Sequence, residues 1–323
     1  MSTPRVSVVI PTHQRRASLL RTLAALSSQT LSPGEYEVVV IVDGSDDGSR
    51  EAAESLISPH ERRVLWQDNR GRAAACNAGV AAARAPLIVL LDDDMRPAPG
   101  FLSAHLRAHP AGSRLAVLGA APVEVTPDLR LPASYVGKKF NRHLERLAST
   151  GGPLRLRDFY SGNFSIRRDV LNAVGGFDER FTLYGNEDLE LSIRLRDAGV
   201  RLVFEPSAVA VQTYEKDFAA LARDNISKGR TAVILARKHP GALEQLKIGG
   251  QRGQPIGRRM AVQLLLASTR VVPSLRQLVV RVVTWLGERN AAWVQRLYPA
   301  VLDYFYHCGA RDERGTPQRQ PRA

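Results

Sequence analysis

The chain has 323 residues, of which 44% are hydrophobic and 24% are charged. This balance is typical of a folded globular protein and excludes a disordered chain, and the length allows one large domain or two modest ones. The two cysteines, Cys76 and Cys308, lie far apart in the sequence and form no closely spaced metal-binding pair, which favours a reducing compartment. No window of about 18 apolar residues lacks charge, so no transmembrane span is expected.

The formal net charge of +13 is distributed unevenly along the chain. Residues 1–220 carry 27 Lys and Arg against 26 Asp and Glu, whereas residues 221–323 carry 18 against 6. The excess basicity therefore belongs to the C-terminal third. The first two thirds have the charge of an ordinary, nearly neutral domain.

Strands alternate with helices in the first hundred residues. Short apolar and β-branched runs predict strands at "RVSVVI" (5–10), "YEVVVIV" (36–42) and "APLIVLL" (85–91). The first run is too short, and lacks the cleavage site, for a signal peptide. Helical spacing appears in "RASLLRTLAALSSQ" (16–29) and "GRAAACNAGVAAARA" (71–85). This alternation predicts an α/β fold with a mainly parallel sheet covered by helices on both faces.

A second block, residues 115–212, contains further strand-like runs and an amphipathic helix that opens with Glu187 and Asp188. Its polar middle, residues 126–153, is too long for a structureless connector, so a substrate-covering loop or short helices are expected there. We therefore expect a folded domain at 1–220, divided near residue 115 into two halves. A basic helical region at 221–310 and a flexible tail at 311–323 would follow.

Polar clusters follow the predicted strands, where ligands collect in parallel sheets. Asp92, Asp93 and Asp94 come directly after a buried strand, and three adjacent carboxylates raise one another's pKa unless a cation compensates. A hard divalent cation, Mg²⁺ or Mn²⁺, would compensate while keeping positions free for phosphate oxygens. The alternative is a solvated acidic turn or a helix N-cap.

Two other acidic segments admit two interpretations each. From Asp43 to Glu54 the spacing matches a calcium-binding loop, but the apolar strand before Asp43 indicates a strand-end loop instead, because a calcium loop needs a helix on both sides. Glu187 and Asp188 lie in a predicted first helical turn. There they either cap the helix or supply a general base.

Five motifs occur together in order: "VSVVIPTHQR", "EVVVIVDGSDDGS", "DNRGRAAACNAGVAAARAPLIVLLDDDM", "SGNFSIRRDVLNAVGGFDERF" and "YGNEDLELSIRLRDAGVRLVFEP". In this order and spacing, they closely resemble family 2 glycosyltransferases of the GT-A fold. The resemblance covers roughly residues 5–212. It implies inverting transfer of a sugar from a nucleotide donor, with a UDP-sugar favoured over a GDP-sugar, to an acceptor hydroxyl.

The resemblance also implies that the domain at 1–220 is catalytic, with a nucleotide-sugar half at about 1–115 and an acceptor half at about 116–220. It implies residue roles as well. The nucleotide sugar would be bound by Pro11, Thr12, Asp43, Gly71, Arg72, Asp92 and Asp93. Mn²⁺ or Mg²⁺ would be bound by Asp94 with Asp92, and the catalytic base would be Asp188, beside Glu187. The sugar or acceptor pocket would be lined by Gly162 and Asn163. One base suffices for direct displacement at the anomeric carbon, unlike the carboxylate pair of a glycoside hydrolase.

Three positions depart from the family pattern. Val42 replaces a frequent Asp, Cys76 replaces a frequent Arg, and Gln212 stands where many relatives have His. Because of Val42, nucleotide contact would depend on Asp43 alone. Because of Cys76, the phosphate contacts would come from Arg70 or Arg72. Gln212 leaves undecided whether the protein supplies a third ligand to the metal. The QxxRW-type signature of processive synthases is absent, so transfer of one sugar per acceptor encounter is expected.

The basic C-terminal third interleaves arginines with apolar and aromatic residues, a pattern typical of a segment that lies on a membrane surface. The alternative is a helical subdomain that packs on the catalytic domain or forms a homodimer; nucleic acid is the least favoured partner. A glycan or lipid-linked acceptor of the cell envelope, and a cytoplasmic location at the inner face of the membrane, fit the first interpretation.

Two other functions compete with that of a transferase. An inactive GT-A-like adaptor would bind membrane or nucleic acid through the basic region, but the intact Asp92–Asp94 cluster and the Glu187-Asp188 pair argue against it. A dinucleotide-dependent oxidoreductase is excluded, because no GxGxxG turn follows the first strand.

Overall fold

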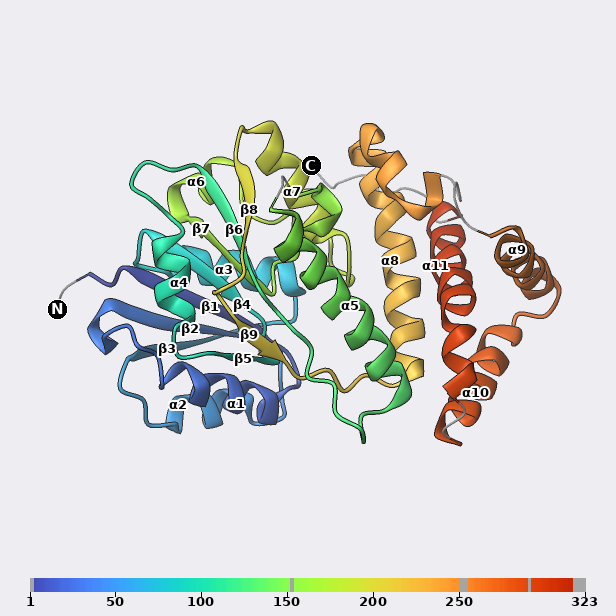
Figure 1. Cartoon of the computed structure of the whole chain (residues 1–323), viewed down its shortest axis with the longest axis horizontal. Helices are drawn as coiled ribbons and strands as arrows, with labels where there is room; N and C mark the ends of the chain where they lie inside the picture. Colours follow the sequence, from blue (N-terminus) through green and yellow to red (C-terminus); the bar gives the residue numbers. More distant parts are fainter. Residues whose placement is uncertain (1–2, 152–153, 250–254, 290–291, 316–323) are drawn as a thin grey trace. The chain divides into compact units, whose positions relative to one another are not determined.

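A computed structural model describes residues 3–151, 154–249, 255–289 and 292–315 (Figure 1). The chain divides into two compact units. The first, here called the sheet unit, comprises Met1–Glu124, Gly137–Thr182 and Glu187–Tyr214. The second, the helical unit, comprises Val125–Val136, Leu183–Asn186 and Glu215–Ala323.

The sheet unit contains a seven-stranded sheet in the order β3-β2-β1-β4-β7-β6-β8 and a two-stranded sheet of β5 and β9. The strands are β1 (Val6–Thr12), β2 (Tyr36–Asp43), β3 (Glu61–Gln67), β4 (Leu87–Leu91), β5 (Met95–Pro97), β6 (Leu115–Gly119), β7 (Asn163–Arg167), β8 (Arg201–Glu205) and β9 (Ala210–Gln212). Only β7 runs antiparallel to its neighbours in the large sheet. The predicted mainly parallel sheet is therefore confirmed.

Helices cover both faces of this sheet. They are α1 (Arg16–Leu26), α2 (Ser49–Ser55), α3 (Arg72–Ala82), α4 (Phe101–Arg107), α5 (Leu131–Thr150), α6 (Arg168–Ala173) and α7 (Glu187–Asp197). Val8, Val38 and Val40 belong to the core cluster that contains the buried leucines of α1. The alternate residues Val9 and Ile41 lie against Gly79 of α3. Because both faces are covered, the central strands are apolar at nearly every position, which made them readable in the sequence.

Two elements differ from expectation. Strand β3 was not predicted, because it is an edge strand with charged residues and little buried surface. The polar segment 126–153 was expected as a loop or short helices, and this was wrong, because residues 131–150 form one long helix, α5. Its apolar positions Phe140, Leu144 and Leu147 recur at helical spacing among charged residues, and Leu144 and Leu147 are buried.

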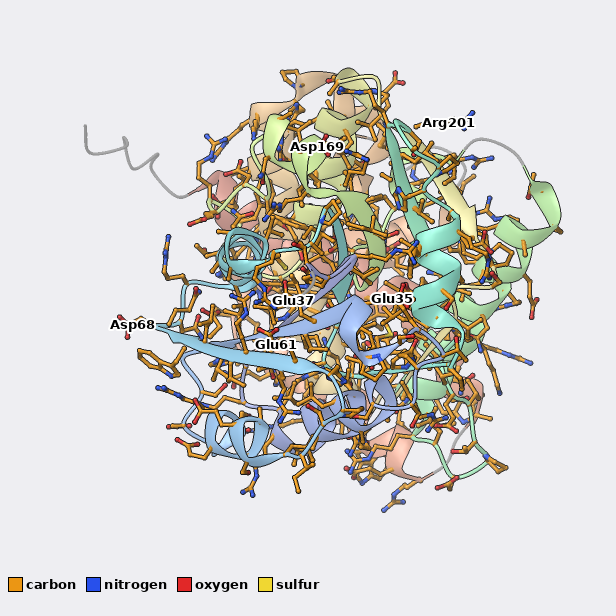
Figure 2. All side chains as sticks on the ribbon, turned by 90° about the vertical axis from the view of Figure 1, so that its left-hand side faces the viewer. Glu35, Glu37, Glu61, Asp68, Asp169 and Arg201 are labelled. Atoms are coloured by element: carbon orange, nitrogen blue, oxygen red, sulfur yellow. The ribbon has the colours of Figure 1, made fainter. Side chains whose placement is uncertain are left out.

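A buried charge network fixes the edge of the sheet at which the parallel strands begin. Glu37 on β2 accepts hydrogen bonds from Ser7 at 2.6 Å, from Arg63 at 2.9 Å and from the backbone N–H of Arg84 at 2.7 Å. Arg84 also pairs with Glu61 on β3. Figure 2 shows Glu37 and Glu61 near each other on this side of the unit. The carboxylates at this edge are thus paired with arginines. The polar residues predicted to form the site lie at the opposite edge, where strands β1, β2 and β4 end.

The helical unit is built on α8 (Phe218–Lys238) and α11 (Tyr298–Arg314), which lie side by side (Figure 1). The other elements are η3 (Pro240–Gln245), η4 (Lys247–Gly249), α9 (Ile256–Val271), α10 (Leu275–Glu288) and η5 (Ala292–Arg296). A Cβ on Gly229 would lie 1.9 Å from the backbone oxygen of Tyr306, so only glycine allows this close crossing. Residues 311–314 belong to α11, not to the expected tail, and residues 316–323 lie outside the described residues.

Candidate active site

The ends of β1, β2 and β4 bring the predicted polar residues to one edge of the sheet unit. Parallel strands place their carboxyl ends together, and β1 lies between β2 and β4 in the sheet order. Pro11 and Thr12 end β1, Asp43 ends β2, and Asp92 follows β4 directly. Pro11 is buried in the sheet beside Ile41.

Asp43 holds the loop that connects β3 to α3. One carboxylate oxygen accepts hydrogen bonds from Gln67 Nε2 at 2.7 Å and from the backbone N–H of Arg70 at 2.9 Å. The other accepts from the backbone N–H of Gly71 at 2.9 Å. Gly71 has φ +87°, a left-handed conformation that favours glycine. The buried Asp43 carboxylate therefore orders the turn from which Arg72 enters the site.

Of the three consecutive aspartates, Asp93 and Asp94 share Arg15 as a partner, whereas Asp92 pairs with Arg72. Asp93 accepts from the Thr12 hydroxyl at 2.7 Å and from Arg15 Nη1 at 3.0 Å. Burial raises the pKa of Asp93 to about 6, although Arg15 and Thr12 oppose the rise. Asp93 is thus tied to the β1 end of the site and is the most buried of the three aspartates.

Asp94 lies between a cationic and an amide side chain. Arg15 Nη1 lies 2.9 Å from Asp94 Oδ2, and Gln212 Nε2 lies 3.3 Å from Asp94 Oδ1. Burial and the nearby charge of Asp92 raise the pKa of Asp94, while Arg15 and Gln212 lower it. The carboxylate therefore needs a positive charge, which Arg15 supplies here.

Arg72 connects Asp92 to Asp188 through Ser161. Its Nη2 donates to Asp92 Oδ1 at 2.7 Å, and its Nη1 donates to Ser161 Oγ at 2.7 Å. The Ser161 hydroxyl in turn donates to Asp188 Oδ1, which lies 3.7 Å from Arg72 Nη1. Burial raises the pKa of Asp188, and Arg72 and Ser161 counteract the rise. A guanidinium and a hydroxyl thus hold two carboxylates from distant parts of the sequence in one cluster.

Asp188 occupies the second position of α7, directly after Glu187. The N-terminal turn of a helix stabilises a carboxylate through its exposed N–H groups and dipole. Glu187 is buried, whereas the Asp188 side chain keeps 30% of its surface exposed. Of the two acids, Asp188 is therefore the one accessible to a substrate.

Gly162 and Asn163 have different surroundings. A Cβ on Gly162 would lie 2.4 Å from Asp92 Oδ2, so glycine is required for the Asp92 carboxylate to lie against this backbone. Asn163 is fully buried, and its side chain bonds to His105 and to the backbone oxygens of Ala120 and Ala208. Asn163 therefore connects core elements, and only Gly162 touches the carboxylate cluster.

The donor set fits a hard divalent cation held jointly with a substrate. Within the described residues, no group of three or more His, Cys, Asp or Glu side chains is arranged to hold a metal ion. Asp94 has an elevated pKa caused partly by Asp92, and the neutral amide of Gln212 lies beside it. Mg²⁺ and Mn²⁺ sites commonly use one or two carboxylates and take their other ligands from phosphate oxygens and water.

Two residues of the cluster were missed by sequence reasoning. Arg15 precedes α1, and no spacing rule marks it as a partner of Asp93 and Asp94. Ser161 opens the motif "SGNFSIRRDVLNAVGGFDERF", but no feature of the sequence distinguishes this serine from the others. Between the two candidate arginines, Arg72 lies in the cluster, whereas Arg70 pairs with Glu179 at an exposed position.

Comparison with known proteins identifies the class to which this fold and this edge cluster belong. Residues 7–175 match the model of a family described as "Glycosyl transferase family 2", and residues 142–217 match one described as "N-terminal domain of galactosyltransferase". The first match covers more than half of the chain. The protein therefore belongs to glycosyl transferase family 2, as its motifs predicted.

Similar curated proteins include a validoxylamine A glucosyltransferase of Streptomyces hygroscopicus subsp. limoneus, which is 32% identical over 274 residues, covering 75% of this chain and 58% of that protein. A pre-mycofactocin glycosyltransferase of Mycobacterium tuberculosis (strain H37Rv) is 28% identical over 307 residues, covering 92% of this chain and 60% of that protein. The chain thus spans about 60% of the length of the curated relatives it matches.

Solved structures confirm the GT-A fold. A mannosyltransferase from Pyrobaculum calidifontis, in complex with GDP-Man and Mn²⁺, aligns with a TM-score of 0.60 at 20% identity and covers 98% of this chain and 88% of that chain. S. aureus TarS 1-349 aligns with a TM-score of 0.51 at 16% identity, covering 98% and 93% of the two chains. At these identities the likeness concerns the fold alone.

Proposed function

We propose that this protein transfers a single sugar from a nucleotide-diphosphate sugar to an acceptor hydroxyl, with inversion at the anomeric carbon. The observation that carries the proposal is the chain of contacts from Asp92 through Arg72 and Ser161 to Asp188. It joins a carboxylate at a strand end, where a nucleotide sugar would bind, to a partly exposed carboxylate suited to accept a proton.

In this proposal, the nucleoside lies over the ends of β1 and β2. Pro11 and Thr12 border the base, and Asp43 faces the base or ribose. The bonds from Asp43 to the backbone of Arg70 and Gly71 support an indirect contribution as well, because they fix the loop that leads to Arg72. Arg72 takes the phosphate-contacting role that Cys76 cannot fill, since burial raises the pKa of that thiol to about 12 and keeps it neutral.

Asp188 acts as the general base. The acceptor hydroxyl oxygen forms a bond to the anomeric carbon while its proton passes to Asp188, and the bond to the diphosphate breaks with its electron pair. Attack from the face opposite the leaving group inverts the configuration. The raised pKa of Asp188 favours proton acceptance, and the positive charge of Arg72 opposes the rise.

Asp94 and Asp92, with Gln212 as a further neutral ligand, would hold Mn²⁺ or Mg²⁺ against the diphosphate. When bound, the cation stabilises the negative charge that grows on the leaving group. The proximity of Gln212 to Asp94 supports this assignment, and its amide oxygen is a ligand type that hard cations accept.

We further propose a UDP-sugar as donor, with a GDP-sugar as the alternative, and a glycan or lipid-linked acceptor of the cell envelope. A cytoplasmic site of action at the inner face of the membrane would give access to both substrates. The catalytic domain would span residues 1–220. A homodimer formed through the basic helical region is the alternative use of that region.

The test is a donor screen with Mn²⁺ and with Mg²⁺ that identifies the nucleotide released from a panel of UDP- and GDP-sugars. Asp188→Asn should lower turnover by about a thousandfold while donor affinity stays within a factor of about two. The matched control is Asp169→Asn, an exposed aspartate paired with Arg167. Full turnover in the Asp188 variant would refute the base assignment, and no release from any donor would favour the inactive adaptor.

A further inference from the structure

Exposed apolar side chains are concentrated in one part of the helical unit. Ten of the sixteen large apolar side chains that are exposed among the described residues fall between residues 256 and 297. They are Ile256, Met260, Leu264, Val271, Val272, Leu278, Val282, Trp285, Trp293 and Leu297. Exposed apolar groups scattered singly need no explanation, but a grouping of this kind marks an interaction surface.

On α9 these side chains form a stripe. Ile256, Met260 and Leu264 recur every four residues, and their side chains are 67% to 74% exposed. Val271 continues the stripe two turns later and is 83% exposed. The buried residues of α9, Val262 and Thr269, lie on the opposite side of the helix. The helix therefore packs through one face and presents an equally apolar second face outward.

Helix α10 repeats the pattern. Leu278, Val282 and Trp285 recur at spacings of four and three residues and are about half exposed. Val283 is the buried residue of this helix. Trp285 has the guanidinium of Arg289 at 4.0 Å from its ring centroid, so an aromatic ring and a cation occupy the same outward face. Only Val272, Pro273 and Ser274 connect the two helices.

The charges around this apolar surface are mostly positive. Residues 256–289 contain six arginines and one acidic residue, Glu288. Two of the arginines are bound to α11, where Arg258 pairs with Asp303 and Arg276 with Asp312. The other four are exposed and flank the stripes; they are Arg259, Arg270, Arg281 and Arg289.

We propose that α9, residues 272–274 and α10 form a docking surface for an anionic phospholipid bilayer. The apolar stripes would enter the boundary between headgroups and acyl chains, and the flanking arginines would meet lipid phosphates. Among the described residues, no helix is both long enough and apolar enough to cross a bilayer, so the helices would lie in the plane of the surface.

The charge and the apolar character of this surface favour a bilayer over a second copy of the chain or a nucleic acid. Two copies that met through it would bring eight exposed arginines together with two glutamates, whereas an anionic bilayer supplies the opposite charge. A nucleic acid would match the arginines but would leave Ile256, Met260 and Leu264 against phosphates. Of these three partners, the anionic bilayer is the one that matches both the apolar and the basic groups. The inference requires no step of sugar transfer, so its test fails or succeeds separately.

The test is flotation of the full chain with phosphatidylcholine vesicles that contain, or lack, phosphatidylglycerol. We expect flotation with the anionic vesicles, and weakening by salt. The triple variant Met260→Ser, Leu264→Ser, Trp285→Ser should bind at least about tenfold more weakly. Its matched control is Ile57→Ser, which removes a side chain that is 95% exposed in the sheet unit. Equal losses in both variants would overturn the proposal.

The arginines are tested by Arg259→Gln and Arg281→Gln, each expected to weaken binding about fivefold. Arg201→Gln, an exposed position of the sheet unit labelled in Figure 2, is the control and should have no effect. In a Trp66→Phe background, the fluorescence of Trp285 and Trp293 should shift to shorter wavelength on anionic vesicles. Light scattering tests whether this surface instead binds a second copy of the chain. Lipid docking would be overturned if the parent protein were a dimer that did not float with vesicles and the triple variant were a monomer.

Discussion

The sheet unit and the helical unit use arginine in different surroundings. In the sheet unit, Arg15 and Arg72 turn inward and bind the carboxylates of Asp93, Asp94 and Asp92. In the helical unit, four arginines of α9 and α10 lie at the surface beside exposed apolar stripes. The same residue type thus balances a buried acidic cluster in one unit and borders an outward-facing surface in the other. Net charge alone, +13, does not distinguish these two uses.

The largest effect that would test this comparison is expected for Arg72→Gln. Loss of the guanidinium removes the partner of Asp92 and the donor to Ser161, so kcat/KM should fall by about a thousandfold. Burial raises the pKa of Asp188 and Arg72 opposes that rise, so in the variant the pKa should rise further. Because the base must be ionised, the acidic limb of the kcat/KM profile should move to higher pH.

Arg70→Gln provides the control for this variant. Arg70 lies two residues away in the same loop but is exposed and pairs with Glu179. Its substitution should change kcat/KM by less than about twofold, as expected for a surface ion pair. An acidic limb that moved to lower pH in the Arg72 variant, or equal losses in both variants, would show that Arg72 does not act on Asp188.

A second prediction separates the two units. In Gly229→Ala, the new Cβ would lie 1.9 Å from the backbone oxygen of Tyr306, so α8 and α11 must move apart, at a cost of about 3 kcal/mol in the free energy of unfolding. We expect the helical unit to melt at lower temperature while the sheet unit still binds the donor. Calorimetry measures the melting, and nucleotide titration measures donor binding. Gly257→Ala on α9 meets no atom within 4 Å and should not destabilise. Loss of donor binding together with the helical transition would contradict independent units.

The smallest effect concerns Arg15. Its guanidinium lies 2.9 Å from Asp94 and supplies the positive charge that a metal would otherwise provide. Arg15→Gln should therefore raise the affinity for Mn²⁺ in the absence of nucleotide by about fivefold, an effect of about 1 kcal/mol. Electron paramagnetic resonance of free Mn²⁺ measures this directly. Arg16→Gln, the exposed neighbour, should leave the affinity unchanged, and a weaker affinity in the Arg15 variant would refute competition.

Much of the fold could be predicted from the sequence. Strands β1, β2 and β4 and helices α1 and α3 follow from local apolar patterns that match the period of each element. The two failures have different causes. Strand β3 lies at the edge of the sheet, carries charged residues and buries little. In α5, charged and polar residues interrupt the apolar positions, so the helical spacing of those positions was overlooked.

The sequence by itself determined the family, the order of the strands and helices that it marked, and the acidic residues at strand and helix ends, because these depend on local periodicity and on motif order. Only the tertiary structure decided which groups meet. Contacts such as those of Arg15 with Asp94, or Ser161 with Asp188, join residues 79 and 27 positions apart, and no local pattern encodes their pairing. The burial of Asn163 and the outward face of α9 are likewise set by what packs against each residue.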